Sequence, residues 1–548
     1  MSAYAKDDLV FNSNEDHNLE LLRKLNGKLQ KIAQGGGERS VAKHKARGKM
    51  TARERIQALL DDKEAFLEIG ALAADGMYEE YGGCPSAGVV TGIGRVSGKL
   101  CMIVANDATV KAGAWFPMAG KKNLRAQEIS IENHLPIIYL VDSAGVFLPM
   151  QDEIFPDKEN FGRIFRNNAV MSSMGIPQIA AIMGPCVAGG AYLPIMSDEA
   201  LIVDGTGSVF LAGPFLVKSA IGEDVDIETL GGATTHSEIS GVTDYKMPDD
   251  ATCLETIRSL IAKQGEKPRA GYNRVKPISP KYPEKELLGI LPSDRAKPYD
   301  MRKLIERMVD KDSMDEYKTD YGQSIICTYA RIDGWAVGIV ANQRKVLKSA
   351  KGEMKFGGVI YSDSADKAAR FIMNCNQKLI PLVFLQDVTG FMVGSRSEHG
   401  GIIKDGAKMV NAVSNSVVPK FTFIIGNSYG AGNYAMCGKA YDPRLIFAWP
   451  SARIAVMGGA QAAKTLLQIE KASAKKKGEE ISAEKEAEML KVITDKYDAQ
   501  TSPYYGAARL WVDGIIDPRR TREIISTGIE MASLNPDIPA FNPGVIQT

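Results

Sequence analysis

Short apolar runs alternate with stretches of helical period along most of the chain. Runs such as PIIYLVD (136–142) and PLVFLQD (381–387) are rich in β-branched and aromatic residues and become polar only at their ends. An apolar run of this length is typical of a strand buried on both faces of a sheet. The pattern therefore predicts an α/β fold built from repeated ββα units.

Three segments depart from this pattern. Residues 16–35 carry leucine and isoleucine at helical spacing, which predicts an amphipathic helix. Residues 266–294 hold five prolines and many charges, so we interpret them as a linker between two halves. Residues 464–497 are rich in lysine, glutamate and alanine, which predicts an exposed helical insertion in the second half.

Four blocks of the first half recur in the second half in the same order. The matched pairs are RVSGKLCMIVAND (95–107) with RIDGWAVGIVANQ (331–343), KNLRAQEISIENHLPIIYLVDSAG (122–145) with KAARFIMNCNQKLIPLVFLQDVTG (367–390), GPCVAGGAY (184–192) with GNSYGAGNY (426–434), and LIVDGTGSVFLAGP (201–214) with LIFAWPSARIAVMGG (445–459). This order indicates an internal duplication. The glycine-rich turns of the third pair follow buried runs and let the backbone come close to a neighbour.

Composition bounds the class and the location of the protein. A chain of 548 residues with 45% apolar residues predicts two to four domains with large cores. With 67 basic and 66 acidic residues the net charge is +1, so no global field favours nucleic acid or an anionic membrane. The start, MSAYAKDDLVFNSNEDHN, lacks the apolar core of a signal peptide and the character of a transit peptide, so we expect a bacterial cytoplasmic protein.

Cysteine and histidine usage narrows the chemistry. The seven cysteines lie far apart without a CxxC pair, which argues against a zinc site or a disulfide framework, and we expect no metal. Residues 167–197 carry no charge, but their prolines and glycines favour a buried strand and turn over a membrane helix. None of the five histidines recurs at a matched position, so no acid–base set is evident.

Longer motifs give the chain a specific resemblance. They are FPDKENFGRIF (155–165), CVAGGAYLP (186–194), GFMVG (390–394), YGAGNYAMCGKAYDPR (429–444) and SPYYGAARLWVDGIIDP (502–518). From about residue 17 to 535 the chain resembles the carboxyltransferase (beta) subunits of biotin-dependent acyl-CoA carboxylases, especially those of 3-methylcrotonyl-CoA carboxylase. The resemblance implies a duplicated crotonase-like (ClpP/crotonase) fold with two tandem ββα-superhelix domains. It places an acyl-CoA domain at 1–275, a linker at 276–294 and a biotin domain at 295–548.

The implied reaction gives each glycine-rich turn a role. Carboxyl transfer to an acyl-CoA places negative charge on the thioester oxygen and on the ureido oxygen of biotin, and backbone N–H groups stabilise such charges. By resemblance, Gly189 and Gly190 serve the acyl-CoA oxygen, and Ala431 and Gly432 serve biotin. The alternative, purely structural interpretation is that the glycines in both turns only allow a helix to pack closely on the sheet.

The resemblance also implies binding residues, a cofactor and partners. The implied substrate-binding residues are Ala188, Ala144, Gly145, Arg163, Phe391 and Gly430. Only GEMKFGG (352–358) resembles a biotin-attachment turn, and it lacks the surrounding carrier domain. Carboxybiotin is therefore expected on a partner alpha subunit that holds the biotin carboxylase and the biotin carrier, with a CoA thioester as substrate. The family further implies a homo-oligomeric core, a hexamer, with active sites between subunits.

Recurring charged residues have a structural and a functional interpretation. Asp142 and Asp387 end matched apolar runs, where we expect them to cap the next turn. Lys122, Arg125, Lys367 and Arg370 are expected on solvated helix faces, although contact to CoA phosphates would also explain them. The basic stretch 38–55 is expected to form a helical arm against a neighbouring subunit or CoA, rather than a nucleic-acid arm.

Some positions depart from the methylcrotonyl pattern and leave the substrate open. Ala144, Val146 and Met150 stand where a glycine, an alanine and an arginine are usual, which would suit a longer, straight-chain or geranyl acyl group. The same fold would also serve as a subunit of a biotin-dependent acyl-CoA decarboxylase or as a non-catalytic scaffold. Intact small residues in both turns favour catalysis.

Overall fold

The computed structural model describes residues 8–348, 352–476 and 481–548. Two of our sequence-based expectations fall partly outside this range. They concern residues 1–7, where we expected no signal peptide, and residues 477–480 of the expected insertion. By internal contacts the chain forms two units. Asn26–Arg269 with Ala507–Leu510 is here called the N-terminal unit, and Met1–Leu25, Ala270–Gly506 and Trp511–Thr548 the C-terminal unit.

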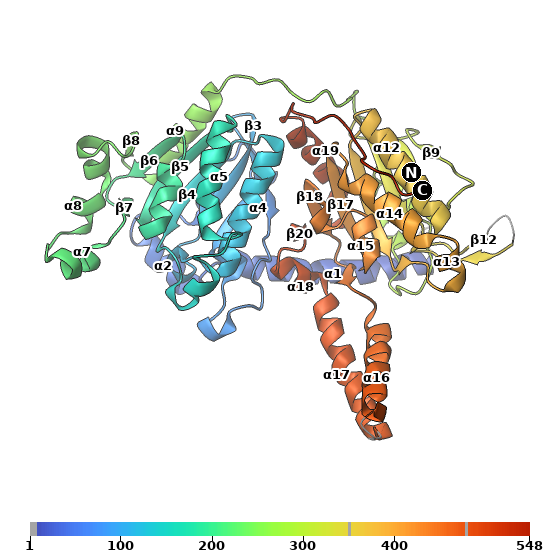
Figure 1. The fold of residues 1–548 in the computed structure, drawn as a ribbon. Helices are drawn as coiled ribbons and strands as arrows, with labels where there is room; N and C mark the ends of the chain where they lie inside the picture. The colour runs from blue at the N-terminus through green and yellow to red at the C-terminus, as the bar shows by residue number, and fades with distance from the viewer. Residues whose placement is uncertain (1–7, 349–351, 477–480) are drawn as a thin grey trace. The chain divides into compact units, whose positions relative to one another are not determined.

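The N-terminal unit is built on one eight-stranded sheet (Figure 1). Its order is β1-β2-β3-β4-β5-β6-β8, and β7 pairs with the far end of β5. The first two pairings are antiparallel and the others parallel. The strands are β1 (Leu67–Ile69), β2 (Val89–Val96), β3 (Lys99–Asn106), β4 (Ile137–Ser143), β5 (Gln178–Val187), β6 (Glu199–Val203), β7 (Ser208–Phe210) and β8 (Tyr245–Met247).

The C-terminal unit repeats this sheet strand for strand. Its order is β9-β10-β11-β15-β17-β18-β20, with β19 paired to the far end of β17. The strands are β9 (Asp315–Tyr317), β10 (Ile325–Ile332), β11 (Trp335–Asn342), β15 (Leu382–Val388), β17 (Lys420–Tyr429), β18 (Leu445–Ala448), β19 (Arg453–Ala455) and β20 (Gly514–Ile515). Two small ribbons are added, β12 (Leu347–Lys348) with β13 (Met354–Lys355), and β14 (Val359–Ile360) with β16 (Gly390–Phe391).

Backbone details of the two sheets also repeat. Ser97–Gly98 and Asp333–Gly334 each connect two antiparallel strands, with φ angles of 49° and 81° in the first turn and 52° and 81° in the second. Such two-residue turns need positive φ at both positions, which favours glycine at the second. The register also shifts at the same place, between Val141 and Ser143 in β4 and between Gln386 and Val388 in β15. The predicted duplication is therefore confirmed down to its irregularities.

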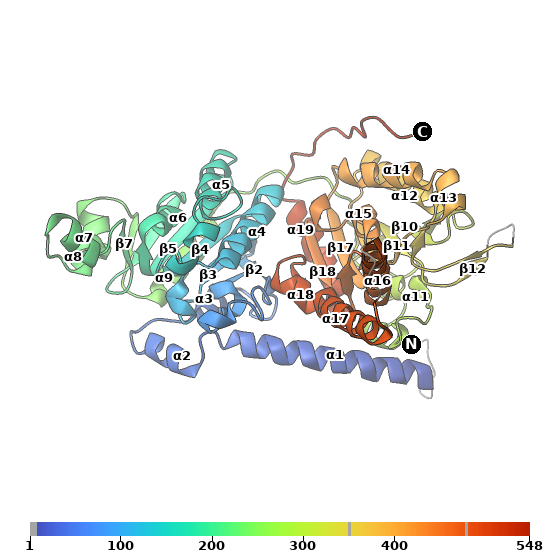
Figure 2. The same cartoon turned by 60° about the horizontal axis from the view of Figure 1, so that its bottom comes forward.

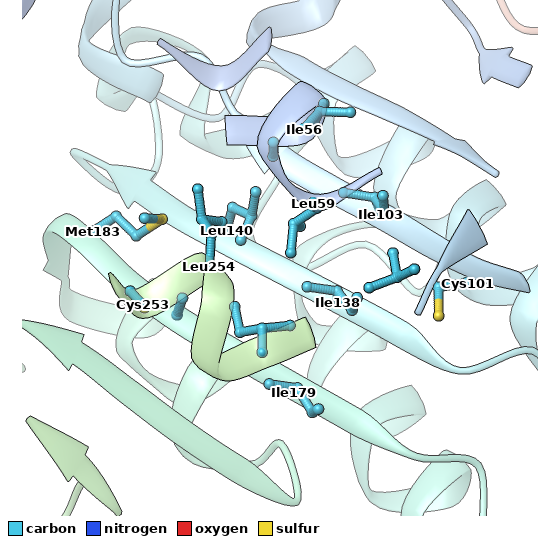
Figure 3. Packing of buried hydrophobic residues seen from close by; sticks show 14 of the residues in the cluster. Ile56, Leu59, Cys101, Ile103, Ile138, Leu140, Ile179, Met183, Cys253 and Leu254 are labelled. Atoms are coloured by element: carbon cyan, nitrogen blue, oxygen red, sulfur yellow. The ribbon is translucent and has the colours of Figure 1, made fainter. Parts of the chain in front are cut away.

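Helices cover both faces of each sheet. In the N-terminal unit α3 and α9 pack on one face, and α4 and α5 lie on the other (Figure 2). The helices of this unit are α2 (Glu38–Lys45), α3 (Ala52–Leu59), α4 (Pro117–Asn133), α5 (Phe161–Ser173), α6 (Tyr192–Ile195), α7 (Pro214–Ile221), α8 (Ile227–Gly231) and α9 (Asp250–Lys263). Figure 3 shows Ile56 and Leu59 of α3 and Leu254 of α9 against Ile103, Ile138 and Ile179 of the strands.

In the C-terminal unit α12 and α14 pack on one face, while α19 packs on the other through Gly528 against the Phe421 ring. The helices are α10 (Leu287–Ile290), α11 (Met301–Ile305), α12 (Ser362–Gln377), α13 (Ser395–His399), α14 (Ile402–Ser414), α15 (Ala431–Ala435), α16 (Gly459–Lys476), α17 (Ala483–Thr501) and α19 (Thr521–Ala532). The expected insertion forms α16 and α17, a hairpin that extends away from the sheet of its unit (Figure 1).

Neither unit is a continuous stretch of chain. The helix α1 (Leu9–Ala33) begins in the C-terminal unit, where Asn18 donates to the carbonyls of Leu288 and Leu291. The helix α18 (Pro503–Ala508) ends in the N-terminal unit, where the carbonyl of Ala508 accepts the N–H of Ala74. Each unit therefore needs a segment from the far end of the chain.

Three of the four recurring basic residues correct our expectation of solvated faces. The side chains of Lys122 in α4 and Lys367 in α12 are fully buried. Burial lowers the pKa of Lys122 to about 7, and its Nζ lies 2.6–3.1 Å from three acceptors on Ser86 and Val89. Burial also lowers the pKa of Lys367, whose Nζ has no hydrogen-bond partner among the described residues. Arg125 is buried as well and pairs with Glu128, whereas Arg370 is exposed.

Replacing these matched lysines with methionine is expected to shift stability in opposite directions. Lys367→Met removes an unpaired buried amine and is expected to stabilise the C-terminal unit. Lys122→Met leaves acceptors on Ser86 and Val89 without a donor, which is expected to cost about 1–3 kcal/mol. Amide hydrogen exchange of α12 and α4 measures each effect in its own unit. Equal losses in the two variants would contradict the difference in hydrogen bonding.

Candidate active site

The two glycine-rich turns lie at matched places in the two sheets. The first, Ala188–Gly190, follows β5 and leads into α6, and the second begins at Gly430 after β17 and opens α15. Ala188 has a φ of 55° and Gly430 a φ of 52°. A residue with positive φ thus begins each turn as the backbone leaves the strand, although only the second turn has glycine at that position.

The neighbouring strand ends beside each turn. An added Cβ on Gly145, which follows β4, would lie 3.3 Å from the carbonyl oxygen of Val187. An added Cβ on Gly432 would lie 3.3 Å from Cα of Gly390, which follows β15. The predicted residues Ala144 and Gly145 therefore lie beside Ala188–Gly190, and Phe391 lies beside the second turn.

The first turn combines a closed and an open side. An added Cβ on Gly189 would lie 2.9 Å from the Phe161 ring, whereas one on Gly190 would meet no atom within 4 Å. The thiol of Cys186, which lies beneath the turn, donates to the carbonyl of Gly190 at 3.1 Å, and burial raises the pKa of this thiol. Gly190 therefore has free space in front of it.

A serine holds the neighbouring Ala144–Gly145 segment. Ser143 Oγ accepts the indole N–H of Trp115 at 2.8 Å and the N–H of Gly145 at 3.1 Å, and it donates to the carbonyl of Gly113 at 2.7 Å. The N–H of Ala144 donates to the carbonyl of Ala112. The N–H groups of Ala144 and Gly145 are therefore used within the protein, so the free face of the site belongs to Ala188–Gly190.

Asp142 does not cap a turn, which corrects our expectation. Its buried carboxylate lies 2.6 Å from Nζ of Lys49 and 3.0 Å from Arg55, which also pairs with Asp250 at 2.8 Å. Burial lowers the pKa of Lys49 despite the carboxylate beside it. Arg55 further donates to the carbonyl of Met183 in β5. The basic stretch 38–55 thus places two cations in the core of its own unit, against Met183 and Gly184 of β5, the strand that leads into the first turn.

Asp387 has a related environment behind the second turn. It lies 3.3 Å from Nε of Arg344, accepts the Tyr299 hydroxyl at 2.9 Å and accepts the N–H of Asn427 at 2.9 Å. Burial, with Asp387 beside it, raises the pKa of Tyr299 well above its ordinary value. The backbone of the two aspartates makes the same hydrogen bond. The N–H of Asp142 donates to the side chain of Asn106, and the N–H of Asp387 donates to the side chain of Asn342.

Sequence reasoning missed the glycines that make room for these carboxylates. An added Cβ would lie 1.9 Å from Asp142 Oδ1 at Gly184, and 2.5 Å from Asp387 Oδ1 at Gly426. These two glycines open the matched turn blocks, so their recurrence was a signal for a shared role. They allow a strand backbone to pass directly over a buried charge.

The remaining predicted residues lie at the edges of the site. Arg163 in α5 is half-buried and faces Glu159 at 3.8 Å. The Phe391 ring packs over Gly406 of α14. Met150 packs against the apolar cluster that contains Phe116, so its side chain fills space within the N-terminal unit.

The second turn opens on a cavity of about 590 Å³ within the C-terminal unit. Its lining includes Ser428, Gly430 and Asn433 near the turn, and Tyr497 and Gln500 of α17. This size is typical of a small-molecule site. In the described part of the chain no cluster of three or more histidine, cysteine or acidic residues is arranged to hold a metal ion. No helix in that part combines the length and apolarity that a bilayer span requires.

The arrangement suits the stabilisation of negative charge on oxygen. N–H groups in the first turn of a helix have no acceptor within the helix and carry partial positive charge. Donors of this kind, fixed in a partly buried site, stabilise an oxygen on which charge develops during reaction. The duplicated fold supplies two such turns, one in each unit.

The chain is similar to proteins of known activity over nearly its whole length. Residues 43–543 match the model of the carboxyl transferase domain. The chain is 49% identical over 521 residues to the biotin-dependent 3-methylcrotonyl-coenzyme A carboxylase beta1 subunit of Mycobacterium tuberculosis, which covers 95% of this chain and 96% of that protein. It is 49% identical over 540 residues to the mitochondrial methylcrotonoyl-CoA carboxylase beta chain of Dictyostelium discoideum, covering 98% of this chain and 88% of that one.

Among solved structures, the beta subunit of geranyl-CoA carboxylase from P. aeruginosa matches with a TM-score of 0.86 and 35% sequence identity. The match covers 100% of this chain and 99% of that chain. Similarity in sequence and in structure thus extends over both units.

Proposed function

Because the chain belongs to the carboxyl transferase domain family, we propose that it transfers a carboxyl group from carboxybiotin to 3-methylcrotonyl-CoA, giving 3-methylglutaconyl-CoA. The predicted family and the predicted duplicated crotonase-like fold are confirmed. The observation that carries the function is 49% identity to two methylcrotonyl-CoA carboxylase beta subunits, against 35% to the geranyl-CoA enzyme.

We assign one turn to each reacting oxygen. Gly189 and Gly190 direct N–H groups at the thioester oxygen of the acyl-CoA, and Ala431 and Gly432 direct theirs at the ureido oxygen of biotin. Free space in front of Gly190 supports the first assignment, and the cavity lined by Gly430 supports the second. Ala144 and Gly145 border the acyl group, Ala188 and Gly430 set the turns, and Phe391 and Arg163 flank the bound ligands.

Carboxybiotin, when bound, supplies the carboxyl group, and a partner alpha subunit carries it. The residues of this chain orient the two ligands and stabilise charge. We further propose a homo-oligomeric core, a hexamer, with sites completed between subunits and a cytoplasmic location. The domain assignment, 1–275 for acyl-CoA, 276–294 as linker and 295–548 for biotin, stays a prediction. Leu287–Ile290 within the linker range pack inside the C-terminal unit.

Carboxyl transfer from free carboxybiotin tests the substrate. The full-length chain is expected to give the highest kcat/KM with 3-methylcrotonyl-CoA among 3-methylcrotonyl-, butyryl- and geranyl-CoA, because it is 49% identical to two methylcrotonyl-CoA carboxylase beta subunits. Product is measured by mass spectrometry. A higher kcat/KM with butyryl- or geranyl-CoA would reassign the substrate, and no transfer to any thioester would contradict the function.

A further inference from the structure

The two turns differ in what lies behind them. The buried side chains Gln386 and Ser428, with Asn433, lie next to the second turn, and Ser428 and Asn433 also line the cavity there. The matched positions behind the first turn hold Val141, Cys186 and Ala191. A polar set in one repeat therefore replaces an apolar set in the other, while the backbone of the two repeats is the same.

The polar set forms a continuous chain of hydrogen bonds. Asn433 Nδ2 donates to Ser428 Oγ at 2.8 Å, and Ser428 Oγ donates to Gln386 Oε1 at 2.6 Å. Gln386 Nε2 then donates to the carbonyl oxygen of Met436 at 2.8 Å. The chain begins in the first turn of α15, crosses β17 and β15, and returns to the residue that follows α15.

This connection fixes a helix that has little stability of its own. A helix of five residues is far too short to hold its geometry without tertiary contacts. The hydrogen bonds attach its first turn and its end to two rigid strands. Because Ala431 and Gly432 begin this helix, the direction of their N–H groups follows from the direction of the helix.

The first turn is held in another way. Phe161 packs on Gly189, and the Cys186 thiol donates to the carbonyl of Gly190. A thiol is a weak donor, and aromatic packing tolerates small shifts better than a chain of short hydrogen bonds does. The second turn is therefore the more tightly oriented of the two.

We propose that Gln386, Ser428 and Asn433 are positioning residues for the biotin half-reaction, which they serve by fixing the N–H groups of Ala431 and Gly432. The proposal rests on the proposed function and assigns a supporting shell to one of its two turns. Gln386 has to be a neutral amide, because it accepts from Ser428 with its oxygen and donates to Met436 with its nitrogen. A carboxylate in its place cannot donate, and it brings negative charge behind a turn that stabilises negative charge.

The isosteric variant Gln386→Glu tests this in the full-length chain. Transfer from 3-methylglutaconyl-CoA to free biotin is expected to fall by up to about 100-fold at neutral pH, because small misalignment of reacting groups has effects of this size. The activity relative to the parent is expected to rise as the pH falls, because the protonated acid regains a donor for Met436. The KM for the acyl-CoA is expected to stay unchanged, while the KM for biotin rises.

Hydrogen exchange gives a readout that is independent of turnover. The amides of residues 431–436 are expected to exchange faster in Gln386→Glu and in Asn433→Ala, while those of residues 190–195 keep their rates. Cys186→Ser is the matched control at the first turn, and it is expected to leave the biotin KM and the exchange at 431–436 unchanged.

Two results would overturn the proposal. The first is that Gln386→Glu leaves the biotin KM and the pH profile unchanged. The second is that Asn433→Ala leaves hydrogen exchange at residues 431–436 unchanged. The second experiment remains informative if the charged variant Gln386→Glu fails to fold. Failure of the proposed function can be distinguished from failure of this proposal, because in the former case the parent protein itself would transfer no carboxyl group to biotin.

Discussion

Replacing Arg55 with methionine is expected to lower the free energy of unfolding of the N-terminal unit by about 3–5 kcal/mol. Arg55 is fully buried and connects Asp142, Asp250 and the carbonyl of Met183. Removing one partner of a buried ionic network leaves uncompensated charge, and this accounts for the large loss. Urea denaturation with hydrogen exchange on α3 and α9 measures the change.

A neighbouring arginine provides the control. Arg53 lies on the same helix and pairs with Glu68 near the surface, where its side chain is 28% exposed. A partly exposed pair of this kind is expected to contribute no more than about 1 kcal/mol. Similar losses for Arg53→Met and Arg55→Met would mean that burial of the network does not determine its contribution.

Deleting one N–H from each turn is expected to separate the two half-reactions. Proline has no N–H, and the loss of one oxyanion donor lowers kcat by about 10²–10³-fold. Gly190→Pro is expected to lower transfer to acyl-CoA by about 10²–10³-fold while decarboxylation of carboxybiotin partly survives. Ala431→Pro is expected to lose both activities. Each variant is assayed with free carboxybiotin, with and without the acyl-CoA.

The structure selects these positions over their neighbours. The space in front of Gly190 accepts a ring, and Ala431 already carries a Cβ at the first helical residue, where proline is well tolerated. At Gly432 a Cβ would lie 2.6 Å from Val388, which would mix steric damage with the loss of the donor. Gly190→Ala and Ala431→Ser keep the N–H and are expected to stay active. Identical failure of both proline variants in both assays would contradict the assignment of one oxygen to each turn.

The architecture was predictable because it rests on local patterns that occur twice. Apolar runs predicted the buried strands, and Gly98 and Gly334 recurred at matched positions, which the structure places in the turns between β2 and β3 and between β10 and β11. The two glycine-rich turns were likewise found as a pair after equivalent strands. Comparison of the two halves thus predicted the repeated architecture, whereas the crotonase-like fold and the roles of the turns were implied by the family resemblance.

The buried charges were not predictable in the same way. Lys49, Arg55, Asp142 and Asp250 lie far apart in the sequence and meet only in the folded unit. A lysine on a predicted helix is normally solvated, so the pattern gave no sign that Lys122 and Lys367 are buried. The hydrogen bonds that connect Asn433, Ser428 and Gln386 were not predicted, because matching the two repeats finds only residues that are the same in both. These three positions are polar in the second repeat and apolar in the first.

The exchange of terminal segments between the units bears on how the protein is made. The N-terminal unit needs Ala507–Leu510, and Leu510 is buried in it, so its last core residue leaves the ribosome only near the end of translation. Asn18 is synthesised early, but the carbonyls of Leu288 and Leu291, to which it donates, are synthesised about 270 residues later. Domains usually fold in order as they emerge. In this protein the nascent N-terminal unit exposes part of its hydrophobic core until Ala507–Leu510 is synthesised. We therefore expect it to need chaperones for nearly the whole time of synthesis.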